Sequence, residues 1–278
     1  LLDAGGAVVT ATRRQSQELA RAYTARQRAA GVAVWETPRI LPWSAWLERA
    51  WRLQAREAPS HEVLADPVAV ARTWEHVVAD SPSGRVLVDA RAAGRGAART
   101  WQLAHDWQVD LADVVPATAE HAAFLDWAHA YRRLRDERAW VDQAGLAALL
   151  SACASRLHAA GFGSGPTGFH GFDELAPARR ALLVSLRAAG HECVELHVDV
   201  RCEHAALHVA ASPELELEAI AAWIVARLQE RPQARLGVVI PDLASCWATV
   251  RRVFDDRLRP SLLAPGASDD RPYALAAG

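Results

Sequence analysis

Short apolar runs alternate with long helical patterns at both ends of this chain. Near the start, the β-branched run Gly6–Thr12 passes directly into an amphipathic stretch, Arg13–Ala30. The alternation returns later, with strand-like runs at 168–172, 192–200, 206–211 and 235–240 and helical runs at 177–189, 213–230 and 243–258. Parallel strands need long crossover connections, and helices supply them here. The pattern therefore predicts an α/β fold built on a parallel sheet.

The middle of the chain follows a different pattern. From Pro42 to about Gly161 one helical run succeeds another, and no strand alternation is sustained. With 278 residues, the chain is also longer than the roughly 100–200 residues of an ordinary domain. We therefore predict a first α/β domain at 1–41 and 162–211, a large all-helical insertion at 42–161, and the start of a second α/β domain at 212–278.

The basic residues narrow the range of functions. The chain contains no lysine, so all 31 of its positive side chains are arginines, and the net charge is −2. Within these residues, the absence of lysine excludes a GxxxxGK[ST] phosphate loop, a Schiff-base lysine and the catalytic lysine of a PD-(D/E)XK nuclease. Because the net charge is close to zero, any site for a polyanion must be local.

The cysteines and the hydropathy pattern indicate the compartment. The four cysteines form no CxxC motif, and the chain contains neither a signal-peptide pattern nor a run of about 18 apolar residues that could span a membrane. We therefore expect a cytoplasmic protein with reduced thiols and no membrane partner.

The start of the first helix is the best candidate for a local anion site. Thr12 followed three residues later by Gln15 fits a capping box. The first amides of a helix have no acceptor within the helix, and Arg13 and Arg14 stand beside them. The sequence predicts a phosphate-binding position here, with a plain solvated helix face as the alternative.

Two other arginine clusters and the tryptophans have simpler interpretations. The clusters lie at 132–138 and 251–259 with acidic residues nearby, so we interpret them as solvated helix faces, although arginine also binds phosphate. Trp43, Trp46 and Leu47 share one face of a helix, which favours core packing over stacking on nucleic-acid bases.

Neither of the remaining polar groups predicts a metal site. Histidines and cysteines gather between 191 and 208, but they alternate along a strand-like run, and no CxxC or HxxxH motif anchors them. Asp173 and Glu174 follow a strand-like run, as a Mg²⁺-holding acid pair would. Without a phosphate-loop lysine, we interpret them as leading into the helix at Pro177, where acids favour the positive end of the helix dipole.

Four segments resemble one class of DNA-processing proteins. The run from Val8 to Tyr23, VVTATRRQSQELARAY, resembles motif Ia of the superfamily-one, UvrD-like helicases. The segments VWETPRILPWSAWL (34–47), FHGFDELAP (169–177) and RLGVVIPDL (235–243) are similar to AddB-type helicase–nuclease subunits and related DNA repair proteins. The four segments span nearly the whole chain.

The resemblance implies a fold and a set of site residues. The first domain would be RecA-like, a degenerate relative of the P-loop NTPases with a helical insertion, and a second RecA-like domain would begin near 235–240. Thr10, Thr12 and Arg13 would contact the DNA backbone, and we add Arg14 because it shares the helix start. Asp173 and Glu174 would form an Asp-Glu box. The box would be degenerate because the acids of a working box directly follow the strand, whereas these two acids do not.

The resemblance also implies a function. The chain would be an inactivated, helicase-like portion of a DNA repair and recombination subunit that guides single-stranded DNA without ATP hydrolysis, cofactor or metal. A PD-(D/E)XK exonuclease domain would lie outside these residues. Two alternatives stay open: a scaffold that docks a UvrD-like or AddA-like helicase subunit, and an active ATPase whose phosphate loop lies outside this sequence.

Overall fold

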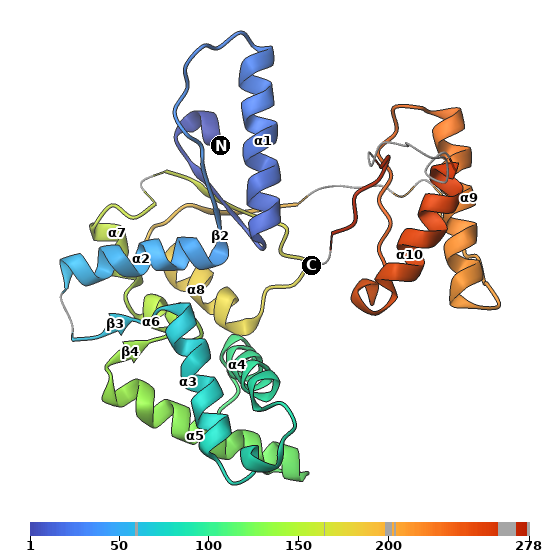
Figure 1. The fold of residues 1–278 in the computed structure, drawn as a ribbon. Coiled ribbons are helices and arrows are strands. Elements are labelled where there is room, and N and C mark those ends of the chain that lie inside the picture. The colour runs from blue at the N-terminus through green and yellow to red at the C-terminus, as the bar shows by residue number, and fades with distance from the viewer. Residues whose placement is uncertain (59–60, 164, 198–201, 203, 261–270, 277–278) are drawn as a thin grey trace. The chain divides into compact units, whose positions relative to one another are not determined.

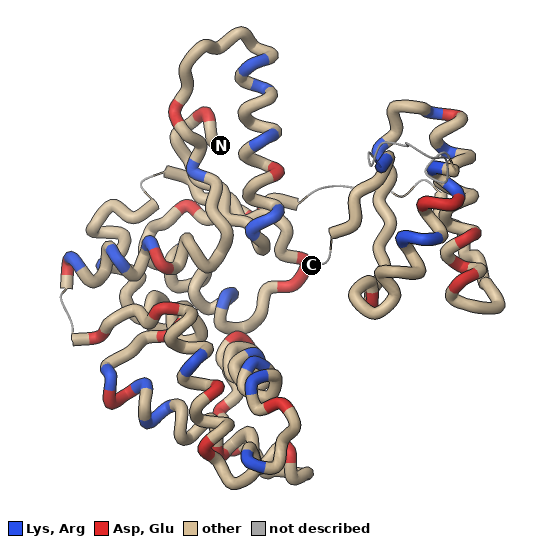
Figure 2. Tube along the Cα trace, viewed as in Figure 1, with Lys and Arg blue, Asp and Glu red and all other residues tan. Residues whose placement is uncertain are grey.

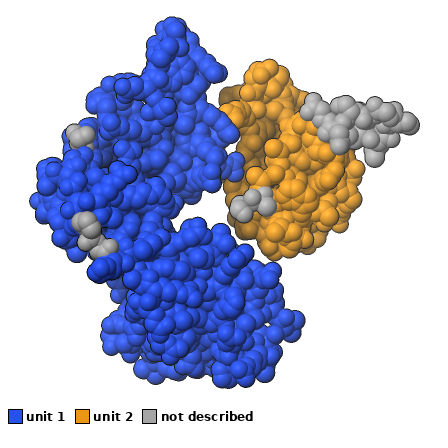
Figure 3. All heavy atoms as spheres, turned by 60° about the vertical axis from the view of Figure 1, so that its left-hand side comes forward, with its two compact units in different colours: residues 1–199 blue, residues 200–278 orange. Residues whose placement is uncertain are grey.

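The structure divides into two compact units. The computed structural model describes residues 1–58, 61–163, 165–197, 202, 204–260 and 271–276. Contacts between Cα atoms separate unit 1, residues 1–199, from unit 2, residues 200–278 (Figure 3).

Unit 1 is built on a four-stranded parallel sheet. Its strands are β1 (Ala7–Thr10), β2 (Arg39–Pro42), β5 (Thr167–His170) and β6 (Cys193–Leu196). Their spatial order is β2-β1-β5-β6, and every pair is parallel. Figure 1 shows the fold of the chain as a ribbon. In register, Thr10 lies opposite Pro42 on one side and His170 on the other. The predicted α/β class with a parallel sheet is confirmed.

Helices cover the sheet on two faces, because successive side chains of a strand point to opposite sides. On one face, Val8 and Ile40 line a hollow together with Leu19 and Tyr23 of α1 (Arg13–Ala29). On the other face, Val9 and Phe169 join a large core formed with four helices, α2 (Trp43–Glu57), α6 (Leu146–Ala152), α7 (Ala154–Ala159) and α8 (Pro177–Ala188).

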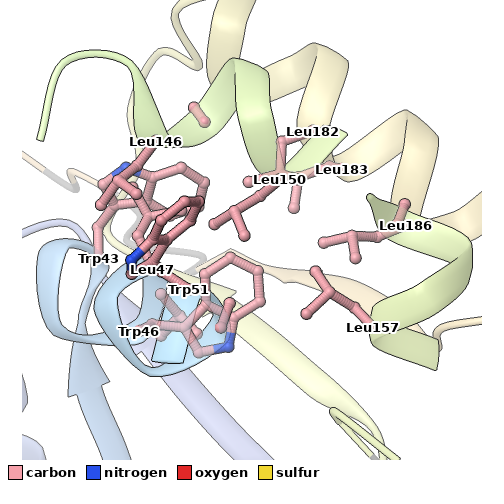
Figure 4. Packing of buried hydrophobic residues seen from close by; sticks show 14 of the residues in the cluster. Trp43, Trp46, Leu47, Trp51, Leu146, Leu150, Leu157, Leu182, Leu183 and Leu186 are labelled. Carbon is pink, nitrogen blue, oxygen red and sulfur yellow. The ribbon is translucent and has the colours of Figure 1, made fainter. Parts of the chain in front are cut away.

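The tryptophans of α2 belong to that core, as predicted. Trp43 and Trp46 are buried, and their rings lie 5.4 Å apart. Trp46 also meets Phe169 of β5 edge-on at 5.5 Å. Figure 4 shows the tryptophans of α2 facing leucines of α6, α7 and α8. Core packing therefore accounts for these rings without any contact to nucleic acid.

Three helices form a second hydrophobic core. They are α3 (Pro67–Asp80), α4 (Ala90–Asp106) and α5 (Ala119–Glu137), which begin at the N-caps Asp66, Asp89 and Thr118. In this core, Trp74 stacks on Tyr131 at 4.2 Å and tilts toward Trp101 at 5.9 Å. Within the segment 42–161, α2, α6 and α7 thus share the core that includes Val9 and Phe169 of the sheet, whereas α3, α4 and α5 have a core of their own.

The segment 42–161 is not all-helical, which corrects the prediction. Two strands of two residues each, β3 (Val63–Leu64) and β4 (Trp140–Val141), pair in parallel. Such strands are too short to show a visible alternation of apolar and polar residues. Two short 3₁₀ helices complete the elements of unit 1, at Leu2–Ala4 and Gly84–Val86.

A buried carboxylate joins the helices of the second core. Asp142 is 3% exposed, and its Oδ2 accepts hydrogen bonds from Trp101 Nε1 and from the Tyr131 hydroxyl, each at 2.9 Å. Its Oδ1 accepts a third from the amide of Gly145, just before α6, at 3.0 Å. Burial raises the pKa of Tyr131, and the neighbouring Asp142 raises it further, so its hydroxyl stays a donor. Asp142 therefore ties α4 and α5 to the start of α6.

Unit 2 contains two helices that pack against each other, α9 (Pro213–Glu230) and α10 (Leu243–Leu258). The strands predicted at 206–211 and 235–240 are wrong, because neither segment is a strand in the structure. A strand requires a hydrogen-bonded neighbour, and the described part of unit 2 offers none. Leu236 and Ile240 instead pack on the helix pair. Of the strand predicted at 192–200, Cys193–Leu196 is confirmed, while 198–200 lie outside the described residues.

Among the described residues, no helix is both long and apolar enough to cross a membrane.

A histidine pair lies beside the sheet. His191 is buried, and its ring packs edge-on against His158 at 4.9 Å. Burial lowers the pKa of His191, and the neighbouring His158 lowers it further. The folded protein therefore holds His191 in its neutral form over a wider pH range than the unfolded chain does.

We expect Asp142→Ala to lower the free energy of unfolding by about 3 kcal/mol, because the Trp101 and Tyr131 donors stay buried without an acceptor. Urea unfolding followed by circular dichroism measures the change. Asp126→Ala, at an exposed position of α5, is the control and should change stability by less than about 0.5 kcal/mol. Equal effects of the two variants would contradict the role given to Asp142.

We also expect His191 to make the free energy of unfolding decrease as the pH is lowered. Between its ordinary pKa of about 6.5 and its lower folded value, the unfolded chain binds more protons, so acid favours unfolding. The melting temperature should drop less from about pH 8 to about pH 5.5 in His191→Leu than in the parent protein. The exposed His129→Leu should keep the parental slope, and an unchanged slope in His191→Leu would refute the assignment.

Candidate functional site

The sheet order creates a switch point between β1 and β5. The chain leaves β1 into α1 on one face and leaves β5 into α8 on the other. In open parallel sheets, ligands bind outside the carboxyl ends of the strands where the connections diverge in this way. The segments at this point are 10–14, after β1, and 170–174, after β5. These are the two segments from which all the predicted site residues come.

The start of α1 is a complete capping box, as the sequence predicted. The Gln15 amide donates to Thr12 Oγ1 at 3.2 Å, and the Thr12 amide donates to Gln15 Oε1 at 3.0 Å. The amides of Arg13 and Arg14 follow the cap in the first turn, where no carbonyl of the helix can accept them. Two amides and the positive end of the helix dipole therefore face outward at the switch point.

Thr10 lies behind this helix start. It is fully buried, and its hydroxyl donates to the carbonyl oxygen of Thr12 at 2.8 Å. This bond ties the end of β1 to the cap of α1. Of the four residues predicted to meet DNA, Thr12, Arg13 and Arg14 are exposed, and Thr10 is in a position to hold them in place.

Arg13, Arg14 and Arg28 of α1 have no acidic partner among the described residues, whereas Arg21 and Arg26 each have one. Arg21 pairs with Glu18 and Arg26 pairs with Asp3, each at 2.6 Å. Among the described residues, neither Arg13 nor Arg14 forms an ion pair or a side-chain hydrogen bond. Both guanidinium groups are therefore exposed and available to an anion.

Gly171 brings the two segments together. It follows β5 with φ 75°, a conformation that glycine adopts without strain. A Cβ at this position would overlap the side-chain amide of Gln15. The capping box of α1 therefore packs directly over the backbone that leaves β5. The sequence analysis did not predict this contact, and its signal is the single glycine at the end of a strand-like run.

Asp173 and Glu174 lie in the same loop, beyond Gly171. Both are exposed, and neither forms an ion pair or a hydrogen bond with another residue that the structure describes. Phe172 anchors the loop by packing edge-on against Trp43 at 5.8 Å. Arg179, at the start of α8, lies 5.7 Å from the same tryptophan ring and pairs with Asp106 of α4 at 3.3 Å. The acid pair thus sits on an anchored loop, while His170 ends the strand itself.

Several arginines of the other two clusters pair with acids. Between α10 and α9, Arg252 pairs with Glu214, and Arg257 pairs with Glu218 at 3.2 Å. Figure 2 shows acidic and basic positions along these two helices. On α5, Arg135 pairs with Asp136 at 2.8 Å and Arg133 lies 3.8 Å from Glu137. These pairs support the interpretation of both clusters as solvated helix faces.

The candidate metal ligands are dispersed. Within the described part of the chain, no three histidine, cysteine, aspartate or glutamate side chains are grouped to hold a metal ion. Cys193 lies on β6, where burial raises its thiol pKa to about 11. Such a thiol stays protonated at neutral pH, which makes it a poor metal ligand.

No protein-family model matches this chain, and no curated protein matches it. The resemblance to AddB-type subunits therefore stays a prediction.

We expect Gly171→Ala to destabilise the protein more than Gly161→Ala. Both glycines have φ near 75°, so each substitution costs about 1 kcal/mol of backbone strain. At Gly161 a Cβ meets nothing, whereas at Gly171 it displaces Gln15 and opens the capping box, for about 1 kcal/mol more. Urea unfolding should show this difference. The difference should vanish when each glycine substitution is made separately in a Gln15→Ala background. A difference that persists there would contradict the proposed contact.

Proposed function

We propose that this protein binds the sugar–phosphate backbone of single-stranded DNA at the switch point between β1 and β5. The observation that carries the proposal is the start of α1, where Arg13 and Arg14 are exposed beside outward-facing amides and have no acidic partner in the described part of the chain. Arginine meets a phosphate with two parallel hydrogen bonds, and a helix start adds amides and a favourable dipole. Phosphate contacts of this kind hold a strand without reading its sequence.

The threonines would act indirectly, by positioning the groups that bind phosphate. The hydroxyl of Thr12 is engaged in the capping box, and the hydroxyl of Thr10 is buried against the Thr12 carbonyl. In this proposal, the guanidinium groups and the first-turn amides touch phosphate. Thr10 and Thr12 position them. Asp173 and Glu174, on the neighbouring loop, would repel phosphates and so keep the strand on the α1 side.

We infer that binding takes place without ATP hydrolysis. No lysine is present to reach the phosphates of a nucleotide, and the acid pair lies past the end of β5 and not directly on it. The parallel sheet with helices on both faces supports, as a finer proposal, a degenerate RecA-like domain. The chain would then serve as the helicase-like portion of an AddB-type DNA repair subunit.

The test is fluorescence anisotropy of a labelled single-stranded oligonucleotide at several salt concentrations. The double variant Arg13→Ala/Arg14→Ala should bind more weakly, and the slope of log K against log salt should fall by about 1.4, or 0.7 for each lost phosphate contact. The control is Arg28→Ala/Arg39→Ala, which removes the same charge from two exposed arginines. Arg28 lies in the last turn of α1 and Arg39 at the start of β2, so both lie away from the carboxyl ends of the strands.

Equal losses in the two double variants would indicate diffuse attraction and would contradict a site at the start of α1. If the parent protein fails to bind even at low salt, the DNA proposal is wrong, and a scaffold that docks a motor subunit becomes the better hypothesis.

A further inference from the structure

An apolar groove opens between α4 and α5, away from the sheet. It has a volume of about 440 Å³ and is lined by the end of α4, the loop 107–118 and the start of α5. Leu103, Trp107 and Val109 line it while 57%, 47% and 48% exposed. Apolar side chains scattered singly over a surface are ordinary, but a group that lines one hollow marks a binding surface. Thr100 and His121 supply its polar groups.

The groove is preformed. Its floor consists of Ala104 and Leu125, which are buried and lie one turn from Trp101 and Ala128 of the second core. Asp142 holds Trp101 of α4 and Tyr131 of α5 through its hydrogen bonds, so both walls stand on one rigid support. A preformed groove saves the ordering cost that a flexible surface would pay on binding.

The loop wall is fixed as well. Gln108 takes φ 55°, an uncommon value for a residue other than glycine, and turns the chain back at the end of α4. The amide of Val109 then donates to the carbonyl of Ala104 at 2.8 Å. This bond places Val109 beside the groove. Leu111 and Val114, further along the loop, line the same wall.

The charges around the groove are unevenly distributed. Asp110, Asp113 and Glu120 flank the lining residues of the loop and of α5, and none of the three forms an ion pair with any described residue. On the α4 side, the charged residues next to the lining in sequence are Arg99 and Asp106, and Asp106 pairs with Arg179 of α8 at 3.3 Å. Two carboxylates of the loop and one at the start of α5 therefore stand next to the lining without an ion-pair partner among the described residues.

We propose that this groove binds an amphipathic helix of a partner protein, apolar on the face that enters the groove and carrying lysine or arginine along the edge that meets the loop 107–118. Helices bind apolar grooves through residues spaced three and four apart, and complementary charges fix their direction. The surface is separate from the start of α1, so its occupancy does not depend on DNA binding.

The probe is a fluorescent peptide with leucine at helical spacing and lysine on the polar face. It should bind the full chain, and Leu103→Glu should weaken the binding by at least about tenfold because it puts a charge in the groove. Val184→Glu on α8 is the matched control, since Val184 is 58% exposed, and it should leave binding unchanged. A triple variant, Asp110→Asn/Asp113→Asn/Glu120→Gln, should weaken binding severalfold at low salt.

Four results would overturn the proposal. The first is that the lysine peptide does not bind, and the second is that a peptide with glutamate in place of lysine binds equally well or more tightly. The third is that Leu103→Glu and Val184→Glu have equal effects. The fourth is that the parent protein forms oligomers that the substitution Leu103→Glu dissociates. The last result would assign the groove to a second copy of the chain. A groove variant that loses peptide binding should keep its DNA binding. The peptide test is therefore independent of the DNA test at Arg13 and Arg14.

Discussion

The parallel pairing of β1 with β5 is the contact on which the rest of unit 1 depends. It runs from Ala7 opposite Thr167 to Thr10 opposite His170 and makes β1 a central strand. The crossovers from β1 to β2 and from β5 to β6 run toward opposite edges of the sheet, so right-handed connections place their helices on opposite faces. As a result, the capped start of α1 and the backbone of Gly171 meet at one edge, although they are distant in sequence.

Charge pairing separates the start of α1 from the other basic surfaces. Two arginines of α10 meet acids of α9, and two arginines of α5 meet acids of their own helix. Exposed pairs of this kind contribute little to stability, but they neutralise the field that would attract a polyanion. Two exposed arginines on a capped helix start are thus a more specific feature than the total number of arginines in the chain.

Local signals in the sequence were sufficient for part of this structure. The capping box at Thr12 and Gln15, the parallel α/β class and the core position of Trp43 and Trp46 all follow from residue type and spacing, and each is confirmed. The strands predicted at 206–211 and 235–240 failed because strand propensity is realised only beside a partner strand. The sharing of one core by α2, α6, α7 and the sheet was also beyond reach, since helical periodicity identifies an apolar face but not the surface that covers it. For the same reason the contact between Gln15 and Gly171, which joins two segments of the candidate site, could not be read from either segment alone.

The long separation between β1 and β5 has a kinetic consequence. A contact between distant segments forms only after the entropy of closing the intervening loop has been paid, and folding slows as such contacts come to dominate. Here the intervening chain carries α3, α4 and α5, which have a local core of their own and therefore a means to become compact early. The central sheet, and with it the edge where α1 begins, would then be among the last parts of unit 1 to assemble.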